Sequence, residues 1–338
     1  MQPKSIIAIM AVAVIFLSLT FQTSNSAQEI TPTPAPSKTP SEDETSSTET
    51  PEATEEINTT QFEPLTQSDL NVLVGNVLRP NGAIWYNDNL YLACTGDSTL
   101  YEVDDVSGDT RTYIFGVQNA HAMYIEEIGE NEINVWVPDY DSNALLRVNR
   151  AGAPQQVATE LDNPWGISYL DENQFLVTNI GNDTLVLVNR DGTVTPILDE
   201  LRSPTGIAVD NDYVYFANNG SARRSIEWLS VEDIVDETIQ PIPQTLVSGL
   251  QNTTNIVMAE DGYLYFAYAL GTRGVVGRID PELCLDGGCT NDQVEVVVYT
   301  ELAAPLAGLT ISSDMRLFIH TIFRPEIYWL QLDTIMNE

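Results

Sequence analysis

His121 and Asn255 stand at positions where four related segments of the chain carry glycine. Glycine is favoured where backbones crowd together, and a polar side chain in its place needs a hydrogen-bond partner once it is partly buried. Histidine can also take up a proton near pH 6.5 when its pKa is unperturbed, so binding through His121 would vary around that pH. The replacement of glycine by these two residues has two possible explanations. Either both side chains bind a ligand, or the repeat has diverged in sequence and each side chain forms hydrogen bonds within its own loop.

Four more residues in equivalent loops could contact a ligand. Asparagine offers hydrogen-bond donors and an acceptor, and tryptophan offers a flat surface for stacking. Asparagine also makes tight turns for purely structural reasons, and this alternative stays open. The predicted ligand-binding residues are Asn81, His121, Trp165, Asn179, Asn219 and Asn255.

Asp139 and Asp141 alternate along the chain, as ligands do in some calcium loops. The segment lacks the glycine and the distal glutamate of an EF-hand. Oxygen ligands suit calcium better than a transition metal, so calcium is the cofactor that the sequence suggests. The sequence gives no sign of nucleophilic catalysis by serine. No serine lies in the strand-turn-helix motif typical of such a nucleophile, and only two histidines are available as the base of a catalytic triad.

Residues 163–198 indicate how such loops are positioned. An apolar strand at 175–178 is followed by a polar loop at 179–183, and two further strands cover 184–188 and 193–198. With the strand that begins at 163, this makes four short strands separated by turns. They form one propeller blade, which cannot bury both of its faces alone and needs neighbours.

Six copies of this unit follow one another, roughly 40 to 50 residues apart. The last copy ends after a third strand at 327–332, and the strand at 71–77 can supply the missing fourth. Closing the ring in this way removes exposed sheet edges. The sequence therefore predicts an all-β fold, a six-bladed β-propeller of four-stranded blades whose ring is closed by an N-terminal strand. The marker positions are Gly82, His121, Gly166, Gly206, Asn255 and Gly308.

The strand order decides where the candidate residues lie. The loop that enters each first strand and the loop that leaves each second strand are on the same face of the disc. All the candidate residues belong to these loops, so we expect them around one mouth of the central channel. Blades two and five are opposite in a ring of six, so His121 and Asn255 should face each other across the axis.

The chain before the repeats has a different composition. Residues 1–27 have the layout of a secretory signal peptide, or of an N-terminal membrane anchor if they are not cleaved. Residues 28–63 are rich in Thr, Pro, Ser and Glu, which predicts a disordered linker. Residues 64–338 form the propeller. We therefore expect an extracytoplasmic protein, secreted or tethered to the outer face of the cytoplasmic membrane.

The net charge of −35 argues against nucleic acid and anionic membrane surfaces as partners. We expect contact with a membrane only through the N-terminal segment, if that segment is not cleaved. Cys284 and Cys289 bracket a flexible loop that could close as a disulfide in an oxidising compartment. Cys94 lies in an apolar strand and should remain a free, buried thiol. We expect a monomer.

The third copy resembles an NHL repeat. The similarity extends over residues 64–338, and such propellers include the regucalcin and gluconolactonase-like calcium-dependent lactonases and the virginiamycin B lyase-like enzymes. The lactonase-like families hold a channel cation with a glutamate near the start of the first blade, where this chain has Arg79 and Asn81. The lyase-like family uses several His and Glu residues, which His121 and His320 alone do not match. The residues that carry the resemblance are Pro164, Gly166, Ile167, Asn179, Gly181 and Asn182.

Two functions remain at this point. The leading interpretation is a secreted or surface-tethered propeller that binds a small molecule, a glycan or a protein at the mouth of its channel. The alternative is a calcium-dependent hydrolase, lactonase or lyase of the gluconolactonase-like type. The fold resemblance does not choose between them.

Overall fold

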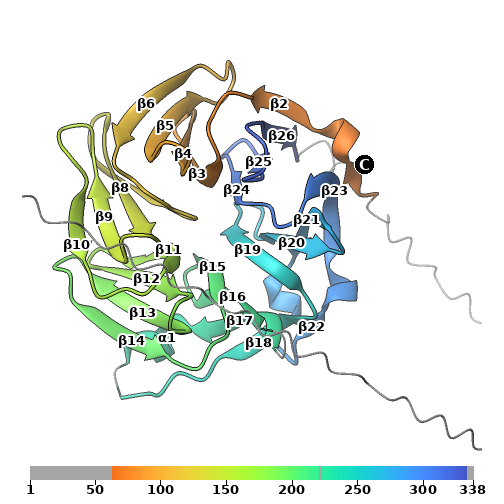
Figure 1. Cartoon of the computed structure of the whole chain (residues 1–338). Coiled ribbons are helices and arrows are strands. Elements are labelled where there is room, and N and C mark those ends of the chain that lie inside the picture. The colour runs from red at the N-terminus through yellow and green to blue at the C-terminus, as the bar shows by residue number, and fades with distance from the viewer. Residues whose placement is uncertain (1–62, 221–222, 237, 333–338) are drawn as a thin grey trace, which may run out of the picture. The chain divides into compact units, whose positions relative to one another are not determined.

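The computed structural model describes residues 63–332, apart from residues 221, 222 and 237. The predicted signal peptide and almost all of the predicted linker lie outside the described residues. In the described part the strands form six sheets, which are arranged as blades around a central channel (Figure 1). The predicted all-β, six-bladed propeller is therefore confirmed.

Blades 1 to 3 are regular four-stranded meanders, in which each strand pairs antiparallel with the next. The first strand of a blade lies beside the channel and the fourth lies at the outside (Figure 1). Blade 1 contains β3 (Pro80–Tyr86), β4 (Asn89–Cys94), β5 (Thr99–Asp104) and β6 (Thr110–Phe115). Blade 2 contains β7 (Tyr124–Gly129), β8 (Glu132–Asp139), β9 (Ala144–Val148) and β10 (Gln155–Ala158). Blade 3 contains β11 (Pro164–Asp171), β12 (Gln174–Asn179), β13 (Thr184–Asn189) and β14 (Val194–Leu198).

Blades 4 and 5 keep this plan and each has one further strand at its outer edge, whereas blade 6 takes its fourth strand from the N-terminal segment. Blade 4 contains β15 (Pro204–Val209), β16 (Tyr213–Gly220), β17 (Arg223–Ser230) and β18 (Gln244–Ser248), with the short helix α1 (Val231–Val235) after β17. Blade 5 contains β19 (Gln251–Met258), β20 (Leu264–Leu270), β21 (Arg273–Ile279) and β23 (Glu295–Ala303). Blade 6 contains β24 (Gly308–Ile311), β25 (Arg316–His320), β26 (Ile327–Gln331) and β2 (Asn71–Val74).

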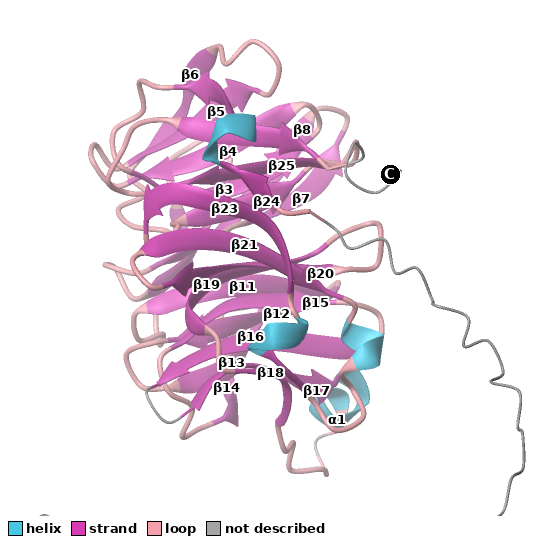
Figure 2. Ribbon diagram, turned by 90° about the vertical axis from the view of Figure 1, so that its right-hand side faces the viewer, coloured by secondary structure: helices cyan, strands magenta, loops and turns pink. Residues whose placement is uncertain are grey.

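Helical turns are few and lie at the edges of the sheets (Figure 2). Besides α1 they are η1 (Gln67–Asp69), η2 (Pro281–Leu283) and η3 (Asn291–Gln293). Among the described residues no helix has the length and apolar character needed to cross a membrane.

The core consists of apolar layers between neighbouring blades. In β12, Phe175 and Val177 pack between blades 2 and 3, whereas Leu176 packs between blades 3 and 4. The second strand of a blade is thus buried on both faces, which is why it reads as a continuous apolar run and not as an alternation. Each blade depends on both of its neighbours for burial.

The ring is closed by β2, as predicted. It pairs antiparallel with β26, with Val72 opposite Tyr328, and so supplies the fourth strand of blade 6 (Figure 1). Val74 and the following Val77 are buried between blades 6 and 1. The preceding strand β1 (Leu65–Thr66) adds a short parallel pairing to β23 of blade 5, which the sequence did not predict.

The repeated glycine is explained by crowding around the channel. A Cβ atom on Gly82 would lie 2.8 Å from the carbonyl oxygen of Ala120 in blade 2, and one on Gly206 would lie 2.7 Å from the backbone nitrogen of Ile256 in blade 5. Such contacts are shorter than a side chain tolerates, so the first strands approach each other closely only because these positions carry no Cβ.

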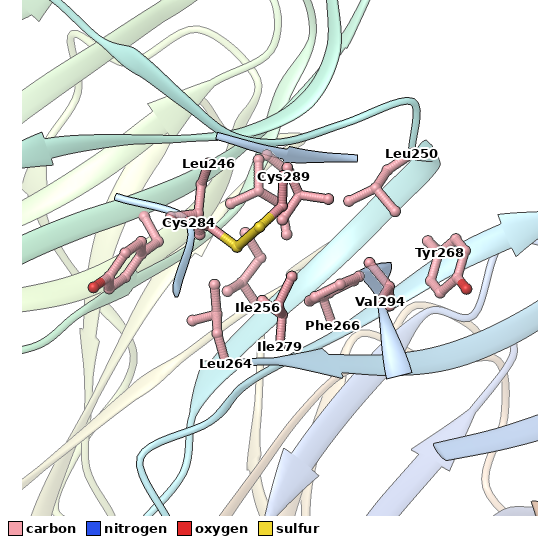
Figure 3. Close-up of a cluster of buried hydrophobic side chains, with 14 of the residues drawn as sticks. Leu246, Leu250, Ile256, Leu264, Phe266, Tyr268, Ile279, Cys284, Cys289 and Val294 are labelled. Carbon is pink, nitrogen blue, oxygen red and sulfur yellow. A yellow bond between two sulfur atoms is a disulfide. The ribbon is translucent and has the colours of Figure 1, made fainter. Parts of the chain in front are cut away.

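Cys284 and Cys289 are joined by a disulfide, and Cys94 is a free, buried thiol. The disulfide lies in the apolar layer between blades 4 and 5, next to Leu246 and Leu264 (Figure 3). After Cys284 the chain forms β22 (Cys289–Thr290), which pairs in parallel with β18 of blade 4. The cysteine loop therefore belongs to blade 5 in sequence but extends the outer edge of blade 4.

Candidate functional site

One face of the ring collects the loops that the sequence analysis placed together. In blade 1 the backbone N–H of Thr95, after the second strand, donates to the carbonyl of Arg79, before the first strand. The corresponding bond in blade 2 runs from Tyr140 to Asn119. Because these bonds tie the two kinds of loop together within a blade, both kinds lie at the same mouth of the channel.

The mouth contains a pocket of about 580 Å³ over blades 6, 1 and 2. Polar side chains make up most of its wall, with one apolar residue from the loop after β25. The residues that concern us are Arg79, Asn81, Asn119, His121, Asp141 and Ile322.

His121, which lines this pocket, lies flat against Trp165. The two rings are 3.4 Å apart between centroids and only 8° from parallel, and Tyr140 meets His121 edge-on at 5.5 Å. The Trp165 Nε1–H donates to the carbonyl of Thr254 at 3.2 Å, which fixes the indole. The imidazole therefore rests on a rigid aromatic support supplied by the next blade.

Asn255 reaches His121 from the opposite side of the ring. Its Nδ2 donates to the backbone carbonyl of His121 at 3.4 Å, while its Oδ1 is buried without a partner among the described protein atoms. The Asn255 side chain thus reaches across the axis to the backbone of His121, not to its ring. This contact and the Trp165–Thr254 bond both connect blades on different sides of the channel.

A row of hydrogen bonds connects the pocket wall to His121. The Asn119 Nδ2 donates to Asp141 Oδ1 at 3.1 Å, and the Asn81 Nδ2 donates to Asn119 Oδ1 at 2.7 Å. The same Asn81 nitrogen lies 3.5 Å from His121 Nε2. Four polar side chains from blades 1 and 2 therefore form one continuous chain.

Burial lowers the pKa of His121 to about 3. The imidazole is consequently neutral at any pH between about 5 and 8, and it keeps one N–H donor and one nitrogen acceptor. This corrects the expectation of a ligand affinity that changes around pH 6.5. Binding through His121 should instead be independent of pH in the physiological range.

Of the predicted ligand-binding residues, Asn81 and His121 line the pocket, whereas Trp165, Asn179, Asn219 and Asn255 do not. Asn179 is buried, where it accepts from the backbone of Asp162 and donates to Thr184 Oγ1. Asn219 donates to the carbonyl of Thr253 at 2.8 Å and accepts from its N–H at 2.9 Å. Both asparagines hold neighbouring loops together, which is the structural alternative that the sequence analysis left open.

The acidic pair predicted to bind calcium is divided between two roles. Asp139 is fully buried: its Oδ2 accepts from the backbone of Gln118 at 2.6 Å, and its Oδ1 accepts from Ser142 at 3.0 Å. Asp141 is exposed and accepts from Asn119. Among the described residues no three His, Cys, Asp or Glu side chains form a group that could hold a metal ion. The hydrogen bonds that Asp139 and Asp141 accept are thus with groups of their own and the neighbouring loop.

Asn119 was not among the predicted site residues, although it joins Asp141 to Asn81. Its position two residues before His121, in an entry loop, was the available signal. Arg79 was likewise considered only as a departure from a lactonase pattern, yet its side chain lines the pocket. Comparing the repeats with one another shows which segments are loops. It does not show which of these loops lie next to each other in the folded ring, and this determines the residues that line the pocket.

No family model matches the chain, and no curated protein matches it. Among solved structures, a gluconolactonase from Xanthomonas campestris is 13% identical with a TM-score of 0.59, over 78% of this chain and 89% of that one. A streptogramin B lyase is 15% identical with a TM-score of 0.55, over 77% and 96%. A calcium-binding regucalcin from Agrobacterium tumefaciens is 13% identical with a TM-score of 0.56, over 79% and 94%.

At these identities the likeness concerns the fold and not the site. About four fifths of this chain and most of each neighbour are covered. The chain thus has the six-bladed propeller fold that is also found in gluconolactonase, streptogramin B lyase and regucalcin structures.

Proposed function

We propose that the protein binds a small carbonyl-containing molecule in the mouth pocket and opens an ester or lactone bond in it, as a hydrolase or a lyase. The observation that carries the proposal is His121, an uncharged imidazole that is stacked on Trp165 and lines a polar pocket. The names of two fold neighbours, a gluconolactonase and a streptogramin B lyase, support this reaction class by analogy only.

A neutral imidazole can donate a hydrogen bond to a carbonyl oxygen on which negative charge develops during the reaction. Such a donor is effective when it is already oriented and partly shielded from water. Trp165 and Asn255 provide this orientation through the ring stack and the hydrogen bond to the His121 backbone. No step of the proposal passes through calcium.

The competing function is binding without turnover, in which the pocket holds a small molecule, a glycan or part of a protein. It is favoured by one observation: none of the hydrogen bonds of His121 in the described structure goes to a carboxylate, so it lacks the partner of a catalytic triad. We propose an extracytoplasmic location for either function. The disulfide between Cys284 and Cys289 supports it, because such bonds persist in oxidising compartments.

The test is acid release from gluconolactone and a panel of aliphatic and aromatic lactones, with and without EDTA. His121→Phe keeps an aromatic ring on Trp165 but removes both nitrogens, so we expect turnover to fall about 100-fold or more. His320→Gln, at the other histidine of the chain, is the matched control and should keep full activity. A product heavier by one water marks a hydrolase, and one of unchanged mass marks a lyase.

Two outcomes contradict the proposal. Loss of turnover with EDTA would show that a metal is required and would reject the metal-free reaction. Calorimetric binding of a lactone that is abolished in His121→Phe, without any turnover in the wild type, would establish the binding function instead.

A further inference from the structure

The hydrogen bonds from Asp141 to His121 have a fixed direction. A carboxylate can only accept, so the atom of Asn119 that meets Asp141 Oδ1 at 3.1 Å must be its Nδ2. The Oδ1 of Asn119 is then turned toward Asn81 at 2.7 Å, which requires a donor there, the Asn81 Nδ2. One negative charge thus sets the orientation of two amide groups that would otherwise be ambiguous.

The last member of the row is His121. The Asn81 Nδ2 carries two hydrogens, of which one is used by Asn119, and the other faces His121 Nε2 at 3.5 Å. An N–H group facing a ring nitrogen requires that this nitrogen be the acceptor. The single proton of the neutral imidazole is then on Nδ1, the tautomer opposite to the one that free histidine favours in water.

We propose that Asp141, acting through Asn119 and Asn81, is a positioning residue that holds His121 in the Nδ1–H tautomer, so that the pocket presents a hydrogen-bond donor and selects ligands with an acceptor oxygen. This rests on the proposed function in one respect, that the ligand contacts His121. The ligand class is then a molecule that offers a carbonyl or carboxylate oxygen.

Two features of the pocket agree with an oxygen ligand. The Nδ1 of His121 has no hydrogen-bond partner within the described residues, so its proton is not used by the protein. Arg79, on the same pocket wall, is exposed, and the described structure gives its guanidinium neither an ion pair nor a hydrogen bond. Most other arginines of this acidic protein are paired, for example Arg111 with Glu102 and Arg316 with Asp105.

The test measures the tautomer directly and needs no ligand. The chain contains two histidines, so a protein labelled with ¹⁵N-histidine gives ring signals for His121 and His320 only. The ¹⁵N shifts distinguish a protonated from an unprotonated ring nitrogen. At pH 7 we expect His121 to be protonated on Nδ1 in the wild type. In Asp141→Asn the fixed acceptor is lost, and a mixture or the Nε2–H form should appear, while the His320 signals stay in place.

Asp141→Glu should restore the wild-type tautomer, because it keeps a carboxylate acceptor. Asp183→Asn is a matched control that removes one charge from the corresponding loop of blade 3, and it should leave His121 unchanged. If Asp141→Asn does not fold, as judged by the His320 signals, Asn119→Ala interrupts the same row. An unchanged His121 spectrum in either folded variant overturns the proposal.

The ligand class has its own readout in the lactones that bind. Reducing a bound lactone to the cyclic ether removes the carbonyl oxygen and should weaken binding more than 10-fold in the wild type, but much less in Asp141→Asn. Equal losses in both proteins would contradict the selection of an acceptor oxygen. If the tautomer changes as expected but no lactone is turned over, only the proposed reaction fails, because the spectra were recorded without ligand.

Discussion

At the scale of single residues, His320 is a titratable group that is buried completely. It is fully buried in β25, neither ring nitrogen has a partner among the described protein atoms, and burial lowers its pKa to about 3. The missing Cβ of Gly308 leaves room for its ring. In the unfolded chain the same imidazole titrates near pH 6.5. Below that pH, His320 is protonated in the unfolded chain but stays neutral in the folded protein. The free energy of unfolding therefore decreases as the pH falls.

We therefore expect the free energy of unfolding to depend on pH through His320. Relative to His320→Gln, the wild type should lose about 1.4 kcal/mol per pH unit between roughly pH 6 and pH 4. The comparison of two proteins cancels the titration of the acidic residues, which is common to both. Urea unfolding at several pH values gives the difference. If the free energy of unfolding of the wild type and of His320→Gln changed equally with pH, His320 would not be buried in its neutral form.

At the scale of elements, the cysteine loop joins two blades and not one. From the sequence, loosening after reduction is expected within blade 5. The structure instead pairs β22 with β18 of blade 4, with Cys289 opposite Val247. Closing a loop this short contributes about 2 kcal/mol in the chain-entropy model. Reduction should therefore speed amide hydrogen exchange at β18 and β22 and leave blades 1 to 3 unaffected.

Exchange measured by mass spectrometry, with and without a phosphine reductant, tests this coupling. Thiol counting in denaturant without reductant should find one free thiol, that of Cys94. Exchange that rises only in β20 and β21 would place the effect within blade 5, contrary to the observed strand pairing.

The elements also indicate what the sequence could and could not predict. The second strands were visible because burial on two faces makes them continuous apolar runs, and the closing strand because the last copy is one strand short. β1 and β22 are two residues long and have no periodicity to recognise. The same limit applies to the site, since the partners of Asn179 and Asn219 come from loops that are distant in sequence or in the next blade.

At the scale of the whole molecule, the ring is held by its N-terminal segment. β1 pairs with blade 5 and β2 completes blade 6, so this one segment covers the outer strands of two sheets. Val74 and Val77 are buried with Phe318 and Ile327 between the last and the first blade. An array without these strands exposes the unpaired backbone of β26 and loses apolar burial at the closing interface.

Three truncations separate these contributions. Removing residues 28–63 deletes none of the described strands and should leave the melting temperature nearly unchanged. Removal through residue 70 deletes β1 and η1 and should cause a modest loss. Removal through Val77 also deletes β2, and we expect it to aggregate, because β26 then presents a free sheet edge beside an exposed apolar layer. Thermal unfolding followed by circular dichroism and by light scattering measures both effects. If the longest and the shortest truncation melted alike and remained monomeric, β2 would not be the strand that closes the ring.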